Sequence, residues 1–231
     1  MDLLKALKNN IIVSLQAMTD EPLYDENCII KMADSIINLG GAKALRLAGE
    51  RDIRNIKKLF PDTIVIGITK PSEIPKNYKE LVYITPSVSD CAKIIDAGAD
   101  IVAFDATMRN RGCSDTIEDI IDFIKSKNKL AMADIATFKE AENAKHLGCD
   151  IISTTLSGYT LETQNNPDRP DFELVQKIKE NLDIFTILEG KIWEVSDVKK
   201  AFDSGADSVV IGSAITRPQL IVKRFINAIG K

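Results

Sequence analysis

The 231-residue chain has few cysteines and no long apolar run, and each shortage excludes a class of protein. Its cysteines, Cys28, Cys91, Cys113 and Cys149, stand far apart and form no CxxC pair, which argues against a zinc site or a disulfide framework. No stretch reaches the length of a membrane span, and residues 1–10 lack the apolar core of a signal peptide. We therefore expect a cytoplasmic protein that does not enter a membrane.

Histidine is also scarce, and acidic residues outnumber basic ones, 34 to 30. The formal net charge is -4, whereas nucleic-acid surfaces are rich in lysine and arginine, so we expect a small solute and no nucleic acid as the partner. The lone histidine, His146, falls in the last turn of a predicted helix before Gly148, where a partly positive imidazole suits the helix dipole. Because the carboxylates are scattered as well, we expect neither a metal site nor a cofactor.

What the chain does contain is a repeat. With 45% hydrophobic residues and no linker-like stretch, residues 1–231 are predicted to form one large domain. Four times a helical pattern ends in glycine and restarts as an apolar strand, at 38–45, 96–102, 146–152 and 203–210. Glycine just past a helix permits a left-handed cap, and a short turn then leads into the next strand. These are the junctions of a repeated βα unit.

Eight apolar runs are predicted as strands: 11–16, 42–47, 64–70, 101–106, 129–134, 151–156, 184–189 and 208–212. A ninth, 81–86, follows the third after a segment too short for a crossover helix, so we interpret it as an excursion above that strand. Eight βα units predict an α/β fold of the (β/α)₈, or TIM-barrel, type. A doubly wound sheet is the alternative, but no Gly-x-Gly-x-x-Gly follows the first strand.

In such a barrel the strand ends share one mouth, so the polar residues that end the apolar strands can be considered together. They are Ser14, Gln16, Arg46, Lys70, Asp105, Asp134, Thr154, Thr155, Glu189, Gly212 and Ser213. We interpret Asp105 as a cap, and the two threonines as packing residues of a strand. The charged side chains at the other strand ends must pair with one another or meet a ligand.

Lys70 ends the apolar run 64–70, and on its own it could be a lysine that reaches solvent at the end of a strand. Burial together with a neighbouring cation such as Arg46 would instead lower its pKa, as a general base requires. Glu189 could orient this lysine, shuttle its proton or act on the other face of the reacting carbon. We predict Lys70 and Glu189 as the catalytic pair.

The loops after the last two predicted strands have the composition of a phosphate site. Gly190 and Gly212 allow close approach of the backbone to an anion, while Lys191 and Arg217 can supply charge beside Ser213. The alternative is an ordinary loop in which Ser213 caps a helix. A phosphate anchor beside a lysine and a carboxylate suggests proton abstraction next to a carbonyl.

Taken in order, the motifs resemble the bacterial N-acetylmannosamine-6-phosphate 2-epimerases from about residue 11 to residue 225. The segments that carry the resemblance are 12–16, the strand of Arg46, 65–70, 84–86, 104–107, 132–137, 154–160, 189–190 and 210–218. The most specific read Met-Ala-Asp-Ile-Ala-Thr, Thr-Leu-Ser-Gly-Tyr-Thr and Gly-Ser-Ala-Ile-Thr-Arg-Pro. Pro71-Ser72-Glu73, Leu47-Ala48-Gly49, Gly112 and Lys191 depart from the family pattern, all in predicted mouth loops.

The resemblance implies a cofactor-independent homodimer that interconverts N-acetylmannosamine 6-phosphate and N-acetylglucosamine 6-phosphate in sialic-acid and amino-sugar catabolism. It assigns catalysis to Lys70 and Glu189. Sugar contacts fall on Gln16, Arg46 and Asp134, and phosphate contacts on the loops at 190 and 212–213 with Arg217. Two other hypotheses stay open: a lyase in which Lys70 forms a Schiff base, and a barrel that binds phosphosugars without turnover.

Overall fold

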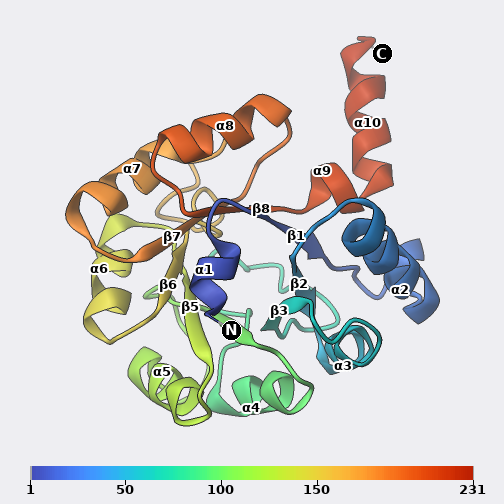
Figure 1. Cartoon of the computed structure of the whole chain (residues 1–231). Helices are drawn as coiled ribbons and strands as arrows, with labels where there is room; N and C mark the ends of the chain where they lie inside the picture. The colour runs from blue at the N-terminus through green and yellow to red at the C-terminus, as the bar shows by residue number, and fades with distance from the viewer. Residues whose placement is uncertain (1, 231) are drawn as a thin grey trace.

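Eight parallel strands close into a barrel in sequential order, which confirms the (β/α)₈ prediction (Figure 1). The structure is a computed structural model that describes residues 2–230; residues 1 and 231 of the expected domain lie outside the described residues. The strands are β1 (Ile11–Leu15), β2 (Ala44–Ala48), β3 (Ile64–Ile68), β4 (Ile101–Asp105), β5 (Leu130–Asp134), β6 (Ile151–Ser153), β7 (Phe185–Glu189) and β8 (Ser208–Ile211). Because β3 ends at Ile68 and β6 at Ser153, Lys70 and Thr155 lie in loops and not on strands.

Helices surround the barrel and cover one end of it (Figure 1). They are α1 (Leu3–Leu7), η1 (Pro22–Tyr24), α2 (Glu26–Asp34), which continues as the π-helical η2 (Ser35–Leu39), α3 (Glu50–Leu59), α4 (Val88–Asp96), α5 (Ile117–Ser126), α6 (Phe138–His146), α7 (Phe172–Asn181), α8 (Val195–Asp203), α9 (Ser213–Thr216) and α10 (Pro218–Ala228). Leu7 of α1 is fully buried against the residues that fill the barrel, so this helix closes the end at which the strands begin. Within residues 2–230, no helix has the length and apolar character to cross a bilayer.

Three of the αβ junctions carry an aspartate that ties the new strand to the previous one. Asp100, Asp150 and Asp207 each follow a Gly-x pair and accept a hydrogen bond from a backbone N–H of the preceding strand at 2.9 Å. Each aspartate also pairs with a lysine of the helix that leads into this partner strand: Lys57 of α3, Lys125 of α5 and Lys179 of α7, respectively. The glycine repeat in the sequence therefore includes a strand-to-strand clamp, which the first junction, at 40–43, lacks.

Residues 81–86 lie between the ends of β3 and β4, in agreement with the expected excursion. The two strands pair only at Ile66–Ile101 and Gly67–Val102. Beyond that point residues 81–86 lie between the two chains and bond to both of them. Thr85 N–H donates to Thr69 O at 3.2 Å, and Asp105 N–H donates to Ile84 O at 3.2 Å. The loop that carries Lys70 therefore begins beside this inserted segment.

Candidate active site

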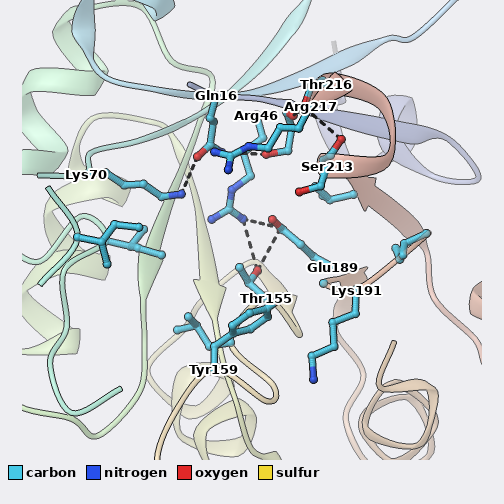
Figure 2. Close-up of a pocket in the computed structure, with 18 of the residues that line it drawn as sticks. Gln16, Arg46, Lys70, Thr155, Tyr159, Glu189, Lys191, Ser213, Thr216 and Arg217 are labelled. Atoms are coloured by element: carbon cyan, nitrogen blue, oxygen red, sulfur yellow. Dashed lines mark hydrogen bonds and ion pairs between the residues drawn. The ribbon is translucent and has the colours of Figure 1, made fainter. Parts of the chain in front are cut away.

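A cavity of about 360 Å³ lies at the mouth where the strands end, and it contains most of the expected site (Figure 2). Of the ten residues predicted to bind or react, nine line it: Gln16, Arg46, Lys70, Glu189, Gly190, Lys191, Gly212, Ser213 and Arg217. The tenth, Asp134, is fully buried behind Arg46. The mouth of the barrel thus brings together residues that are up to 201 positions apart in the chain.

Arg46, on β2, joins the two carboxylates at the floor of this cavity. Its guanidinium donates to both oxygens of Asp134, at 2.9 and 2.5 Å, and to Glu189 Oε2 at 2.7 Å. Burial lowers the pKa of Arg46, but the adjacent Asp134 and Glu189 more than offset this, and the pKa rises above its ordinary value. The arginine therefore stays charged, and it holds Glu189 in a fixed place.

Glu189 is the last residue of β7, and its Oε2 accepts from Arg46 at 2.7 Å and from Ser153 Oγ at 3.4 Å. Burial raises the pKa of its carboxyl, against the attraction of Arg46. Thr155 Oγ1 lies 2.7 Å from Asp134 Oδ1 and 3.1 Å from Glu189 Oε2, so its single hydroxyl proton can serve one carboxylate at a time. The interpretation of Thr155 as a packing residue was wrong, because its hydroxyl lies in the site. Thr154, in contrast, is buried and bonds to the backbone of Glu189.

Lys70 enters the cavity from the side opposite Glu189 (Figure 2). Its amino group donates to Gln16 Oε1 at 2.8 Å, and the amide of Gln16 in turn donates to Ser14 Oγ at 2.9 Å. Burial, with the charge of Arg46 as the next cause, lowers the pKa of Lys70 to about 8. This confirms the expected direction and its two causes. The side chain is half-buried in the cavity and does not extend into open solvent.

The expected phosphate loops line the side of the cavity near Ser213 (Figure 2). Gly190 adopts a φ of +107°, which favours glycine, and Gly212 precedes α9. The guanidinium of Arg217 reaches across the mouth towards Gln16 and pairs with Glu21 at 3.1 Å. Lys191 points away from Ser213, because its amino group donates to Pro167 O at 3.1 Å.

Several lining residues were missed by the sequence analysis. Tyr83, Leu156, Tyr159, Ile192 and Trp193 form apolar and aromatic parts of the wall. Leu156, Tyr159, Ile192 and Trp193 follow a strand end within a few residues, and Tyr83 lies in the excursion 81–86. Many residues in such places do not line the cavity, so these places did not single them out. The expectation for Asp105 is confirmed: its carboxylate accepts from Thr107 N–H at 3.0 Å. Across residues 2–230, no three His, Cys, Asp or Glu side chains gather closely enough to hold a metal ion.

Comparison with known proteins places the chain in a family. A family model described as "Putative N-acetylmannosamine-6-phosphate epimerase" matches residues 29–231. Two curated proteins named "Putative N-acetylmannosamine-6-phosphate 2-epimerase" are each 42% identical to this chain. The one from Clostridium perfringens aligns over 96% of this chain and 98% of its own, and the one from Caldanaerobacter subterraneus over 99% and 94%. The chain belongs to the N-acetylmannosamine-6-phosphate epimerase family.

Solved structures agree with this family assignment. The N-acetylmannosamine-6-phosphate 2-epimerase from Clostridium perfringens superimposes with a TM-score of 0.91 at 39% identity, covering 99% of this chain and 96% of that one. A 3-hexulose-6-phosphate synthase from Salmonella typhimurium reaches only 0.63 at 18% identity, covering 89% of this chain and 90% of that one. At that identity the likeness shows the barrel fold alone, whereas the epimerase match extends to nearly the whole chain.

Proposed function

We propose that this epimerase-family protein interconverts N-acetylmannosamine 6-phosphate and N-acetylglucosamine 6-phosphate by moving the proton at C2. The observation that carries the proposal is the placement of Lys70 and Glu189 on opposite sides of one cavity (Figure 2). Epimerisation needs proton transfer at two faces of one carbon. A lysine with a pKa near 8 is partly neutral at pH 7, so it can accept a proton there.

The reaction runs on the open-chain sugar, in which C2 lies next to the C1 aldehyde. Lys70 Nζ takes the C2 proton, the C–H electron pair becomes the C1–C2 double bond, and the C1 oxygen takes the negative charge. Return of a proton to the opposite face of C2 restores the aldehyde with inverted configuration, so no electrons are gained or lost. The permanent charge of Arg46 at the cavity floor favours the enolate intermediate.

Glu189 is our candidate for the second face. It lies opposite Lys70, and burial raises the pKa of its carboxyl, against the attraction of Arg46. Gln16 and Arg46 are the proposed sugar contacts, and Asp134 acts through Arg46, which separates it from the cavity. Lys70 and Glu189 would then share the proton transfer between two faces.

For the phosphate we propose the wall made by Gly190, Gly212, Ser213 and Arg217. Arg217 supplies the charge, and phosphate binding must compete with its Glu21 partner. The amino group of Lys191 is bound to Pro167 O, so a role in phosphate binding requires this side chain to swing back towards the cavity. We therefore expect Arg217→Gln to weaken substrate binding more than Lys191→Gln does.

Deuterium exchange tests the proposed function directly. In deuterated water, wild-type protein with N-acetylmannosamine 6-phosphate should place deuterium on C2 and form the second sugar, both measured by proton NMR. Lys70→Met and Glu189→Gln should each slow exchange by about 10²- to 10⁴-fold and still bind the phosphosugar in calorimetry. Lys79→Met is the matched control, because Lys79 lies outside the cavity lining and bonds to Gln164.

The open alternatives give different outcomes in the same samples. If wild-type protein binds the phosphosugar but leaves C2 unexchanged, it is a binding barrel and the proposal fails. A covalent sugar adduct on Lys70 after borohydride treatment indicates a Schiff-base lyase. Full exchange by Lys70→Met removes that lysine from the mechanism.

We further propose that the protein forms a homodimer in the cytoplasm. Helix α10 projects away from its own barrel (Figure 1), and none of its residues is buried. Its Val222, Phe225 and Ile226 are 56%, 71% and 50% exposed. A second copy of the chain that covers these side chains would remove this apolar surface from water. The four free thiols fit a reducing compartment.

A further inference from the structure

Thr85 has an unusual backbone conformation for its residue type. Its φ is +44°, in the left-handed region, where a β-branched residue is rarely found. Among residues 2–230, the other non-glycine residues with positive φ are two asparagines and a lysine, so Thr85 is the one β-branched case. It is also fully buried. Such a conformation persists only when the surroundings impose it, and it is a reason to ask what the residue does.

The contacts of Thr85 converge on the residue that precedes Lys70. Thr85 N–H donates to Thr69 O at 3.2 Å, and Thr69 N–H donates to the hydroxyl Oγ1 of Thr85 at 3.0 Å. Both backbone polar groups of Thr69 are therefore held by one residue. Since β3 ends at Ile68, these two bonds stand in place of the β3–β4 ladder just before Lys70.

Lys70 is constrained on its other sides as well. Gly49 N–H donates to Ile68 O at 2.9 Å, which ties the end of β3 to the end of β2. Pro71 follows Lys70, and a residue before proline is confined largely to extended conformations. With the backbone set before and after it, the side chain of Lys70 has a defined starting direction, which points into the cavity towards Gln16.

We propose that Thr85 is a positioning residue for Lys70: through its bonds to Thr69 it fixes the direction in which the lysine enters the cavity. The expected effect on the rate of C2 exchange rests on the proposed function, whereas the expected effect on the direction of Lys70 does not. The strained conformation of Thr85 brings its hydroxyl to Thr69 N–H while its own N–H meets Thr69 O. Neither bond involves substrate, so Thr85 would act only through Thr69.

The position of Lys70 matters because it lies among charges from several elements. Arg46 of β2 and Arg217 after α9 favour the neutral amine, whereas Glu189 of β7 and Asp134 of β5 favour the charged one. Burial is the largest influence, and it too favours the neutral amine. A lysine released from its starting direction would spend more time in water. Its pKa would then rise from about 8 towards the ordinary 10.5.

Three substitutions at Thr85 separate the hydroxyl from the backbone strain. Thr85→Val keeps the shape and removes the hydroxyl acceptor, and Thr85→Ser keeps the acceptor. Thr85→Gly removes the hydroxyl but accepts a positive φ without strain, so it provides a folded test protein if Thr85→Val fails to fold. Thr186→Val is the matched control, because Thr186 is fully buried and loses a similar hydroxyl bond, to Ile184 O, far from Lys70.

The first readout is kinetic. Thr85→Val and Thr85→Gly should lower kcat for C2 exchange by about 10- to 100-fold, because Lys70 no longer points towards its place in the cavity. KM should change by less than about threefold, because the residues that bind substrate keep their positions. Thr85→Ser should recover most of the rate. Thr186→Val should lose stability and keep its kcat.

The second readout needs no activity. Limited acetylation with acetic anhydride across pH 7–11, followed by peptide mass spectrometry, reports the pKa of Lys70. It should rise by about 1 or more in Thr85→Val and Thr85→Gly, and stay at the wild-type value in Thr85→Ser and Thr186→Val. A wild-type protein that fails to exchange C2 would refute the proposed function and leave this readout intact. Wild-type kcat and Lys70 pKa in Thr85→Gly would overturn the positioning role.

Discussion

The pH dependence of C2 exchange should follow the titration of Lys70. With a pKa of about 8, about one lysine in eleven is neutral at pH 7, whereas at the ordinary 10.5 about one in 3,000 would be. The two pKa values differ by about 2.5, so the lowered value increases the ratio of neutral to charged amine about 300-fold at pH 7. Burial, followed by the charge of Arg46, produces this gain. We therefore expect kcat/KM to rise about tenfold from pH 7 and to level off above pH 9.

The assay is C2 deuteration of N-acetylmannosamine 6-phosphate by proton NMR between pH 7 and pH 10. The second phosphate ionisation, near pKa 6, is complete over most of this range and does not distort the profile. Enzyme-free samples at each pH correct for base-catalysed exchange. A rate that still rises tenfold per pH unit between 9 and 10 would mean that Lys70 keeps its ordinary pKa. A rate independent of pH from 7 to 10 would exclude the neutral amine as the base.

Three further predictions concern stability and assembly. Lys70→Met should raise the free energy of unfolding by about 1–3 kcal/mol at pH 7 in urea titrations. Because the folded pKa is the lower one, this gain should shrink as the pH rises from about 8 to 10.5; an equal gain at pH 7 and pH 10 would contradict it. Asp207→Ala should cost about 1–3 kcal/mol and leave exchange unchanged, because it breaks the clamp to Thr186 and Lys179 at the closed end. Phe225→Glu should yield monomers in sedimentation velocity, whereas Glu180→Gln on the exposed part of α7 should not; a monomeric wild type would refute the dimer.

The barrel could be predicted because its signals are local and repeated. Four αβ junctions have glycine after the helix, and at three of them an aspartate two residues later clamps the neighbouring strand. The glycine, the aspartate and the start of the strand stand within a few residues of one another, so the sequence shows the repeat directly. The expected strands are all present, with ends shifted by up to three residues. The positions of Arg46 and Glu189 at the mouth follow from the same pattern, because each lies at or near the end of a strand.

The side-chain details of the mouth could not be predicted in the same way. Thr155 looked like part of a strand, but pairing of β6 ends at Ser153, and the next residues bring its hydroxyl to Asp134 and Glu189. Lys191 was expected to face a phosphate, yet its amino group bonds to Pro167 O. Beyond the last ladder bond, the direction of the chain depends on contacts with distant segments, and no local pattern records these contacts.

Pro71 shows how distant contacts can hold a site next to a residue that restricts the backbone. We expected it, from the resemblance, to be a departure from the family pattern; directly after Lys70, proline removes an N–H and limits the lysine backbone. The amine nevertheless reaches Gln16, because Ile68 and Thr69 are held by Gly49 and by the excursion. The direction of the Lys70 side chain thus depends mainly on the hydrogen bonds of the residues before it, and Pro71 adds a limit on the lysine backbone. We therefore expect substitutions at Thr85 to disturb the direction of the Lys70 side chain more than substitutions at Pro71 do.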